Sequence, residues 1–99
     1  MTTPSSMTRQ SAESLAVAAL GFLAERPDVL GRFLAVTGIG PGEIRRAAAE
    51  PEFLGGVLDY IMGDEALLIE FSRFAEVKPA VVGRARTILS GRAFERDTP

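Results

Sequence analysis

The sequence lacks cysteine, histidine and tryptophan. Without cysteine, neither a disulfide framework nor a thiolate metal site can form, and the composition suits a reducing compartment, so we expect a cytoplasmic protein. Without histidine, the commonest general base and metal ligand is missing, and Lys78 is the only lysine. An oxygen-only magnesium or calcium site is the one metal site that this composition leaves open. We therefore expect no catalytic residues, no metal, no cofactor and no enzymatic activity.

A long apolar run and a strong excess of one charge are also missing. The longest apolar run, residues 15–24, is well short of the roughly 18 residues that a membrane span needs. The formal net charge is -2, whereas a protein that binds nucleic acid through its phosphates usually carries a clear basic excess. The sequence thus predicts no membrane span and argues against nucleic acid as the main partner.

Of the 99 residues, 46% are hydrophobic and 24% are charged, which is typical of one globular domain. Apolar residues recur at helical spacing, most segments begin with proline or a capping residue, and glycine follows several of them. This pattern predicts helices from Thr8 or Ser11 to about Glu25, Pro27 to Gly38, Pro41 to about Ala49, Pro51 to Gly63, after Asp64, and Pro79 to Gly91. No segment alternates with period two for long enough to form a strand.

The expected fold is therefore all-α, a compact single-domain bundle of five or six short helices. Residues 1–8 are predicted to be a disordered N-terminus, residues 9–91 the helical domain, and residues 92–99 a flexible C-terminal tail.

Two similar segments each place a glycine inside a predicted helix. Residues 27–34 align with residues 51–58, and the alignment matches Gly31 with Gly55. Glycine inside a helix costs about 1 kcal/mol relative to alanine. We expect both glycines to lie at helix–helix contacts too close for a larger side chain, because such packing would offset that cost.

The turn at residues 38–42, Gly-Ile-Gly-Pro-Gly, resembles the hairpin of helix-hairpin-helix DNA-binding proteins. The resemblance implies phosphate contacts from backbone N–H groups of the turn and from nearby arginines: Gly38, Gly40, Gly42, Arg32, Arg45 and Arg46. Gly42 stands where the motif commonly has a basic residue, and Glu43 places a carboxylate that would repel phosphate at the start of the next helix. The favoured interpretation is a structural turn, in which a glycine ends one helix and a proline starts the next.

Residues 19–24, 32–38 and 53–65 together resemble a family of small bacterial all-helical proteins described as a domain of unknown function. The resemblance covers roughly residues 12–90, and its more specific part is residues 53–65. It implies a helical fold and a cytoplasmic bacterial setting. It implies no activity, and the family supplies no catalytic residues.

Charge and aromatic side chains are unevenly distributed. Acidic residues predominate over residues 51–76 and basic residues over residues 77–96, which predicts either a charged binding surface or an attraction between neighbouring helices. So thin a bundle cannot bury all of its aromatic rings, and we expect some of the following to stay exposed: Phe53, Tyr60, Phe71, Phe74 and Phe94.

From these features together, we predict a non-enzymatic module that binds a protein partner or, weakly, a second copy. The alternative is a nucleic-acid accessory domain that uses the hairpin.

Overall fold

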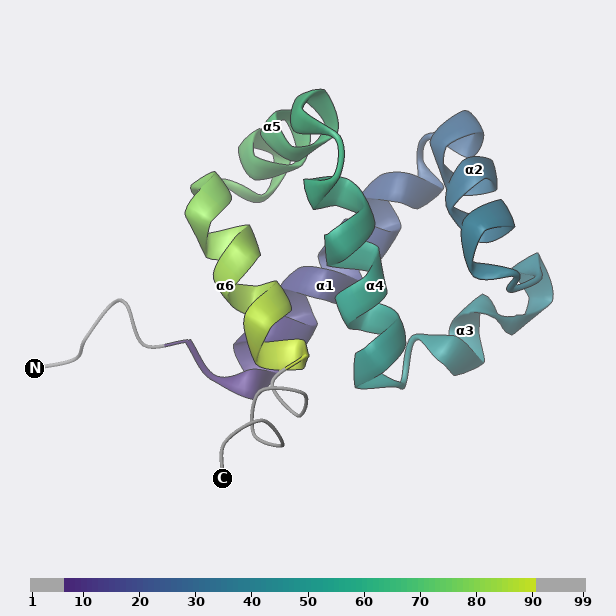
Figure 1. The fold of residues 1–99 in the computed structure, drawn as a ribbon, viewed down its shortest axis with the longest axis horizontal. Coiled ribbons are helices and arrows are strands. Elements are labelled where there is room, and N and C mark those ends of the chain that lie inside the picture. The colour runs from purple at the N-terminus through teal and green to yellow at the C-terminus, as the bar shows by residue number, and fades with distance from the viewer. Residues whose placement is uncertain (1–6, 91–99) are drawn as a thin grey trace, which may run out of the picture.

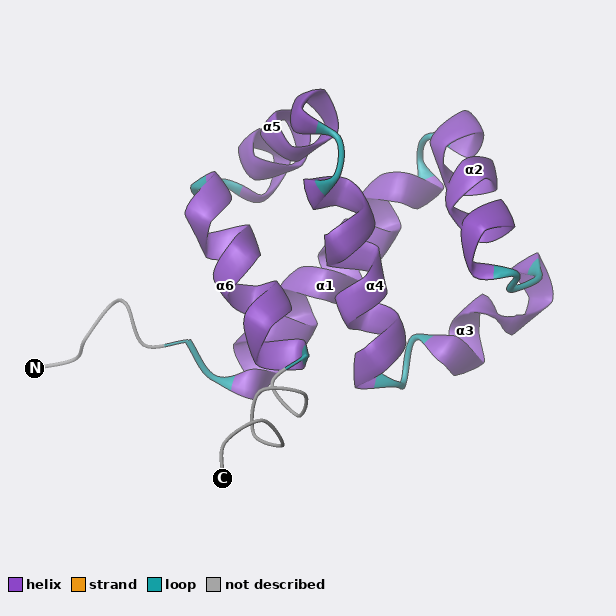
Figure 2. Cartoon of the chain, viewed as in Figure 1, coloured by secondary structure: helices purple, strands orange, loops and turns teal. Residues whose placement is uncertain are grey.

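The computed structural model describes residues 7–90, and every regular element within them is helical (Figure 1, Figure 2). The elements are α1 (Arg9–Ala24), α2 (Pro27–Thr37), the 3-10 turn η1 (Pro41–Glu43), α3 (Ile44–Ala47), α4 (Pro51–Met62), α5 (Glu65–Ala75) and α6 (Pro79–Leu89). The predicted all-α bundle of short helices is confirmed. None of the described helices is both long enough and apolar enough to cross a membrane.

The helices begin and end close to where the sequence signals predict. The Thr8 side chain accepts a hydrogen bond from the Ser11 N–H at 3.0 Å, and the Asp64 carboxylate accepts one from the Leu67 N–H at 3.2 Å. Gly38 ends α2 with a left-handed φ of 77°. Prolines occupy the first turn of three further helices: Pro27, Pro51 and Pro79. The side-chain caps satisfy, and the prolines remove, a backbone donor that the helix start would leave unpaired, and the Gly38 N–H satisfies a carbonyl at the end of α2.

The core lies where α1, α4 and α6 meet, and these helices make the most extensive contacts with one another. In Figure 1, α1 runs behind α4 and α6, and α5 lies across the top of the bundle. The largest fully buried side chains come from five helices: Phe22, Leu23, Phe33, Val57, Leu58, Ile61, Phe71 and Val82. Because α1 contacts α2, α4, α5 and α6, it has the central position that its nearly apolar sequence predicts.

Residues 27–50, which we call the α2–α3 arm, lie on one side of this core. The arm comprises α2, η1 and α3, and Figure 1 shows it on the opposite side of α1 and α4 from α5 and α6. Phe33 is the one buried residue that the arm contributes.

α5 ends in an unusual way. Glu76 has a left-handed φ of 59°, the only positive φ outside glycine in the described residues. The Glu76 N–H donates to the Arg73 carbonyl at 3.2 Å, and the Val77 N–H donates to the Ser72 carbonyl at 2.9 Å. This pair of bonds is the Schellman arrangement, in which glycine normally occupies the left-handed position.

The structure treats the two matched glycines differently, and the prediction for Gly31 needs correction. A methyl group at Gly31 would meet no atom within 4 Å, so the expected close helix contact there is wrong. A methyl group at Gly55 would lie 3.5 Å from Ser90 Oγ and 3.6 Å from Leu89 Cβ, so this glycine does face α6, at ordinary contact distance.

The predicted N-terminal boundary is also too late. Met7 packs against the core, and residue 8 caps α1, so both belong to the folded part rather than to a disordered terminus. Residues 1–6 and 91–99, including the predicted helix stop at Gly91 and the aromatic Phe94, lie outside the described residues.

Candidate functional site

The hairpin at residues 38–42 is held by local hydrogen bonds. The Gly38 N–H donates to the Leu34 carbonyl at 2.8 Å, and the Thr37 hydroxyl accepts from the Ile39 N–H at 3.3 Å. Gly40 is extended, and η1 begins at the proline that follows it. The α-helix after this turn has only four residues, so few aligned peptide dipoles stand behind its N-terminus to attract an anion.

An open pocket of about 160 Å³ lies beside the hairpin, lined by Ile39, Glu43, Arg46, Ala47 and Glu50. Of the predicted phosphate-contacting residues, only Arg46 lines this pocket, and it shares the pocket with two carboxylates. An anion that approached Arg46 would therefore meet two negative charges as well.

The remaining residues of that predicted set are not gathered around the pocket. Arg32 is an exposed residue of α2, and Arg45 is exposed on α3. Gly38 and Gly42 are exposed, and Gly40 is half-buried. None of these five residues lines the pocket.

Several acidic residues between positions 51 and 76 have structural partners. Asp59 on α4 accepts a hydrogen bond from Arg86 on α6 at 2.9 Å, which is the attraction between neighbouring helices that the charge pattern predicts. Asp64 caps α5, and Glu70 forms an ion pair with Arg26 at 3.7 Å. Within residues 7–90, no three acidic side chains come together as a metal site would require.

A second candidate lies where the C-terminal end of α1 meets α5, and we call it the Phe74 surface. It consists of Phe22 and Arg26 near the end of α1 and of Glu70, Phe71 and Phe74 on α5. The Phe74 ring lies 5.3 Å from the Phe22 ring and 6.2 Å from the Phe71 ring, and Phe22 and Phe71 are themselves 5.3 Å apart. Phe22 and Phe71 are fully buried, but Phe74 is 52% exposed.

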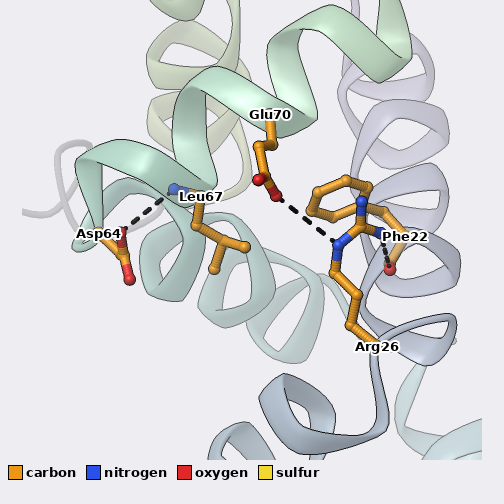
Figure 3. A network of polar contacts seen from close by, with 5 residues as sticks. All are labelled: Phe22, Arg26, Asp64, Leu67 and Glu70. Carbon is orange, nitrogen blue, oxygen red and sulfur yellow. Dashed lines mark hydrogen bonds and ion pairs between the residues drawn. The ribbon is translucent and has the colours of Figure 1, made fainter.

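Arg26 makes three contacts at this surface (Figure 3). Its guanidinium carbon lies 3.7 Å from the centre of the Phe22 ring. Its Nη1 donates to the Phe22 carbonyl at 3.0 Å, and its Nε lies 3.7 Å from a carboxylate oxygen of Glu70. A cation on an aromatic face contributes about 0.5 to 2 kcal/mol, depending on how far it is desolvated. The guanidinium is therefore held in one place, between the Phe22 ring and the Glu70 carboxylate.

The exposed aromatic ring sets this surface apart from the rest of the described chain. The large hydrophobic side chains that are exposed there are Val17, Val36, Ile69 and Phe74. Single exposed aliphatic residues are common on soluble proteins, whereas aromatic and arginine side chains are enriched in protein interfaces. The sequence placed Phe74 in a group of rings of which some should be exposed, but it did not single out Arg26. Arg26 follows Phe22 by four residues, across the end of α1, and this spacing is the signal that could have identified the pair.

A family model described as "Protein of unknown function (DUF3572)" matches residues 9–92. The chain therefore belongs to this family, and the resemblance to a domain of unknown function is confirmed. No curated protein and no solved structure matches the chain.

Proposed function

We propose that this family member is a non-enzymatic module that binds a protein partner, and that the Phe74 surface forms part of its binding surface. The observation that carries the proposal is the Phe74 ring, which is half-exposed although it rests on two buried rings. A cytoplasmic location and the absence of catalytic activity belong to the same proposal, and the lack of cysteine and histidine supports them.

The physical argument concerns what a partner would gain. Fully burying a phenylalanine side chain contributes about 1.5 to 3 kcal/mol, and a large part of that gain is still available at Phe74. The ring already packs on Phe22 and Phe71, so ordering it on binding would cost little entropy. Arg26 is likewise held by its contacts with Phe22 and Glu70. Fixed aromatic and arginine side chains of this kind are typical of interface hot spots.

The Phe74 surface alone is too small for a stable interface. A standard interface buries about 800 Å² on each partner, so neighbouring residues of α1 and α5 would have to contribute. A second copy of the chain is one such partner, and light scattering over a range of concentrations measures that association directly.

The test combines capture with a measured affinity. A partner captured from the source cell would be purified, and its binding to wild type, Phe74→Ser and Val36→Ser would be compared by calorimetry. Val36 is 74% exposed on α2, away from the Phe74 surface, and it provides the matched control. We expect Phe74→Ser to weaken binding by about tenfold or more, as at a hot spot, and Val36→Ser to leave it unchanged. Equal affinities for all three folded proteins would refute the assignment of this surface.

The nucleic-acid alternative has weaker support. The hairpin precedes a helix of four residues, and its pocket contains Glu43 and Glu50 together with Arg46. A phosphate-binding surface needs several basic side chains without carboxylates beside them, and this pocket has one arginine between two glutamates.

A further inference from the structure

The α2–α3 arm is much less buried than the helices on either side of it in the sequence. α1 has six buried residues and α4 has six, whereas Phe33 is the one buried residue of α2, and η1 and α3 have none. The other apolar side chains that the arm turns toward the core are only half-buried: Val29, Leu30, Leu34, Ile39, Ile44, Ala47 and Ala48. Because hydrophobic stabilisation scales with the apolar area removed from water, the arm contributes less stabilisation per residue, on average, than α1 and α4 do.

Phe33 anchors the arm to the rest of the fold. Its side chain is 1% exposed, and its ring lies 5.7 Å from the Phe53 ring and 5.3 Å from the Tyr60 ring, both on α4. The remaining packing of α2 is mainly against α1, while η1 and α3 chiefly contact each other.

Within residues 7–90, no side-chain hydrogen bond or ion pair links the arm to the bundle. Every hydrogen bond that residues 27–49 make in the described part of the chain stays within residues 26–50, and none of the ion pairs found there involves the arm. The bundle has such ties between its own helices, for example the Asp59–Arg86 pair. As far as the described residues go, the contacts between the side chains of the arm and the bundle are therefore apolar.

Both ends of the arm have a short non-helical joint. Arg26, before α2, has φ -125° and ψ 83°, and Glu50, before α4, has φ -104° and ψ 127°. Neither residue makes a side-chain capping hydrogen bond to the helix that follows. The Arg26 side chain is fixed on the bundle by Phe22 and Glu70, so the backbone can turn after this residue without disturbing α1.

We propose that the α2–α3 arm opens from the bundle as a single unit, about the joints at Arg26 and Glu50, while α1, α4, α5 and α6 stay folded. Opening removes Phe33 from its aromatic neighbours and uncovers the faces of Phe53 and Tyr60 on α4. The open form thus exposes the Phe53 ring, which is buried in the closed form, and more of the half-buried Tyr60 ring. This inference does not depend on the proposed function of the Phe74 surface.

Native-state hydrogen exchange on the intact chain, at increasing guanidinium concentrations below the unfolding transition, measures this opening. Cooperative units appear as groups of amides that share one opening free energy and one denaturant dependence. We expect the hydrogen-bonded amides of α2 to form such a group, with protection about tenfold or more below that of α1, α4 and α6. Equal protection in α2 and α4 would overturn the proposal, and so would α2 amides that exchange independently with no denaturant dependence.

A core substitution away from the arm separates unit opening from global unfolding. Val82 is fully buried on α6, which packs on α1, α4 and α5. If the arm opens without disturbing α6, Val82→Ala lowers the protection of α1, α4 and α6 by about tenfold, through the lost packing, and leaves α2 unchanged. An equal loss of protection in α2 would show that the arm opens only when the whole chain unfolds.

Two further variants complete the design. Phe33→Ala breaks a contact that is lost in both the arm-open and the unfolded state, so we expect it to lower protection in α2 and in α4 by the same factor. Val36→Ala, at an exposed position of the same helix, removes no buried contact and should lower neither. A Phe33→Ala variant that left α2 protection at its wild-type level would contradict the role of Phe33 as the anchor.

Discussion

Glu76 is predicted to destabilise the fold, and replacing it with glycine should raise stability. Its left-handed φ of 59° costs an L-amino acid roughly 1 to 2 kcal/mol, a cost that glycine avoids. Glycine in turn loses about 0.5 to 1 kcal/mol through its greater freedom in the unfolded chain. The carboxylate also lies at the negative end of α5, where its removal is worth about 0.3 to 1 kcal/mol. Together these effects predict that Glu76→Gly stabilises the protein by about 1 kcal/mol.

Urea and thermal unfolding followed by circular dichroism would measure this change. For a domain of this size, 1 kcal/mol corresponds to a rise in Tm of about 4 to 8 °C, with the urea m-value unchanged. Glu76→Ala is the matched control, because it removes the carboxylate but retains the cost of the left-handed backbone. We therefore expect Glu76→Gly to be the more stable of the two variants by about 0.5 to 1 kcal/mol. A glycine variant no more stable than the alanine variant would refute the backbone argument.

The other predictions concern the matched glycines and the hairpin. Gly55→Leu should lower the free energy of unfolding by about 1 to 3 kcal/mol through overpacking against α6, and Gly31→Ala should raise it by about 1 kcal/mol because the site is open; urea unfolding that gave both changes the same sign would contradict this contrast. In fluorescence-anisotropy titrations at two salt concentrations, wild type should bind duplex DNA no more tightly than the weak non-specific level, and Glu43→Lys should strengthen binding. Micromolar binding near physiological salt, abolished in folded Arg45→Ala and Arg46→Ala variants, would instead identify the hairpin as a nucleic-acid site.

Helix positions were predictable because their signals are local. Each signal depends only on the few residues around it: a proline in the first turn, a side-chain cap such as Asp64, or a left-handed glycine such as Gly38. The end of α5 could not be predicted in this way, because Glu76 stands where the local signal would be glycine. Its conformation requires the surrounding structure to hold it.

The roles of the matched glycines depend on tertiary packing and could not be deduced from the repeat. Gly31 and Gly55 occupy equivalent positions in similar segments, yet one is exposed on α2 and the other faces α6. α4 packs against α1, α5 and α6, whereas α2 lies at the edge of the fold (Figure 1). A pattern of eight residues contains no information about which helix will have neighbours on both sides.

The same limit applies to the candidate site. Composition indicated that some aromatic rings would be exposed, but the identity of the exposed ring depends on how α5 crosses α1. Phe71 and Phe74 are separated by less than one helical turn, and the crossing buries the first and leaves the second 52% exposed. The hairpin, which the sequence made prominent, has a structural explanation that needs no ligand.

Arg26 is part of both the Phe74 surface and the joint of the α2–α3 arm. Its side chain is part of the Phe74 surface, and its backbone is the first joint of the α2–α3 arm. Substituting Arg26 would therefore change partner binding and arm opening together, and the result could not be assigned to either. Phe74 and Val82 lie outside the arm, on α5 and α6. Phe74→Ser therefore tests partner binding alone, and Val82→Ala tests arm opening alone. Wild-type α2 exchange that is the same with and without a saturating partner would establish that the two features operate independently, because a coupled system would shift arm opening when the partner binds.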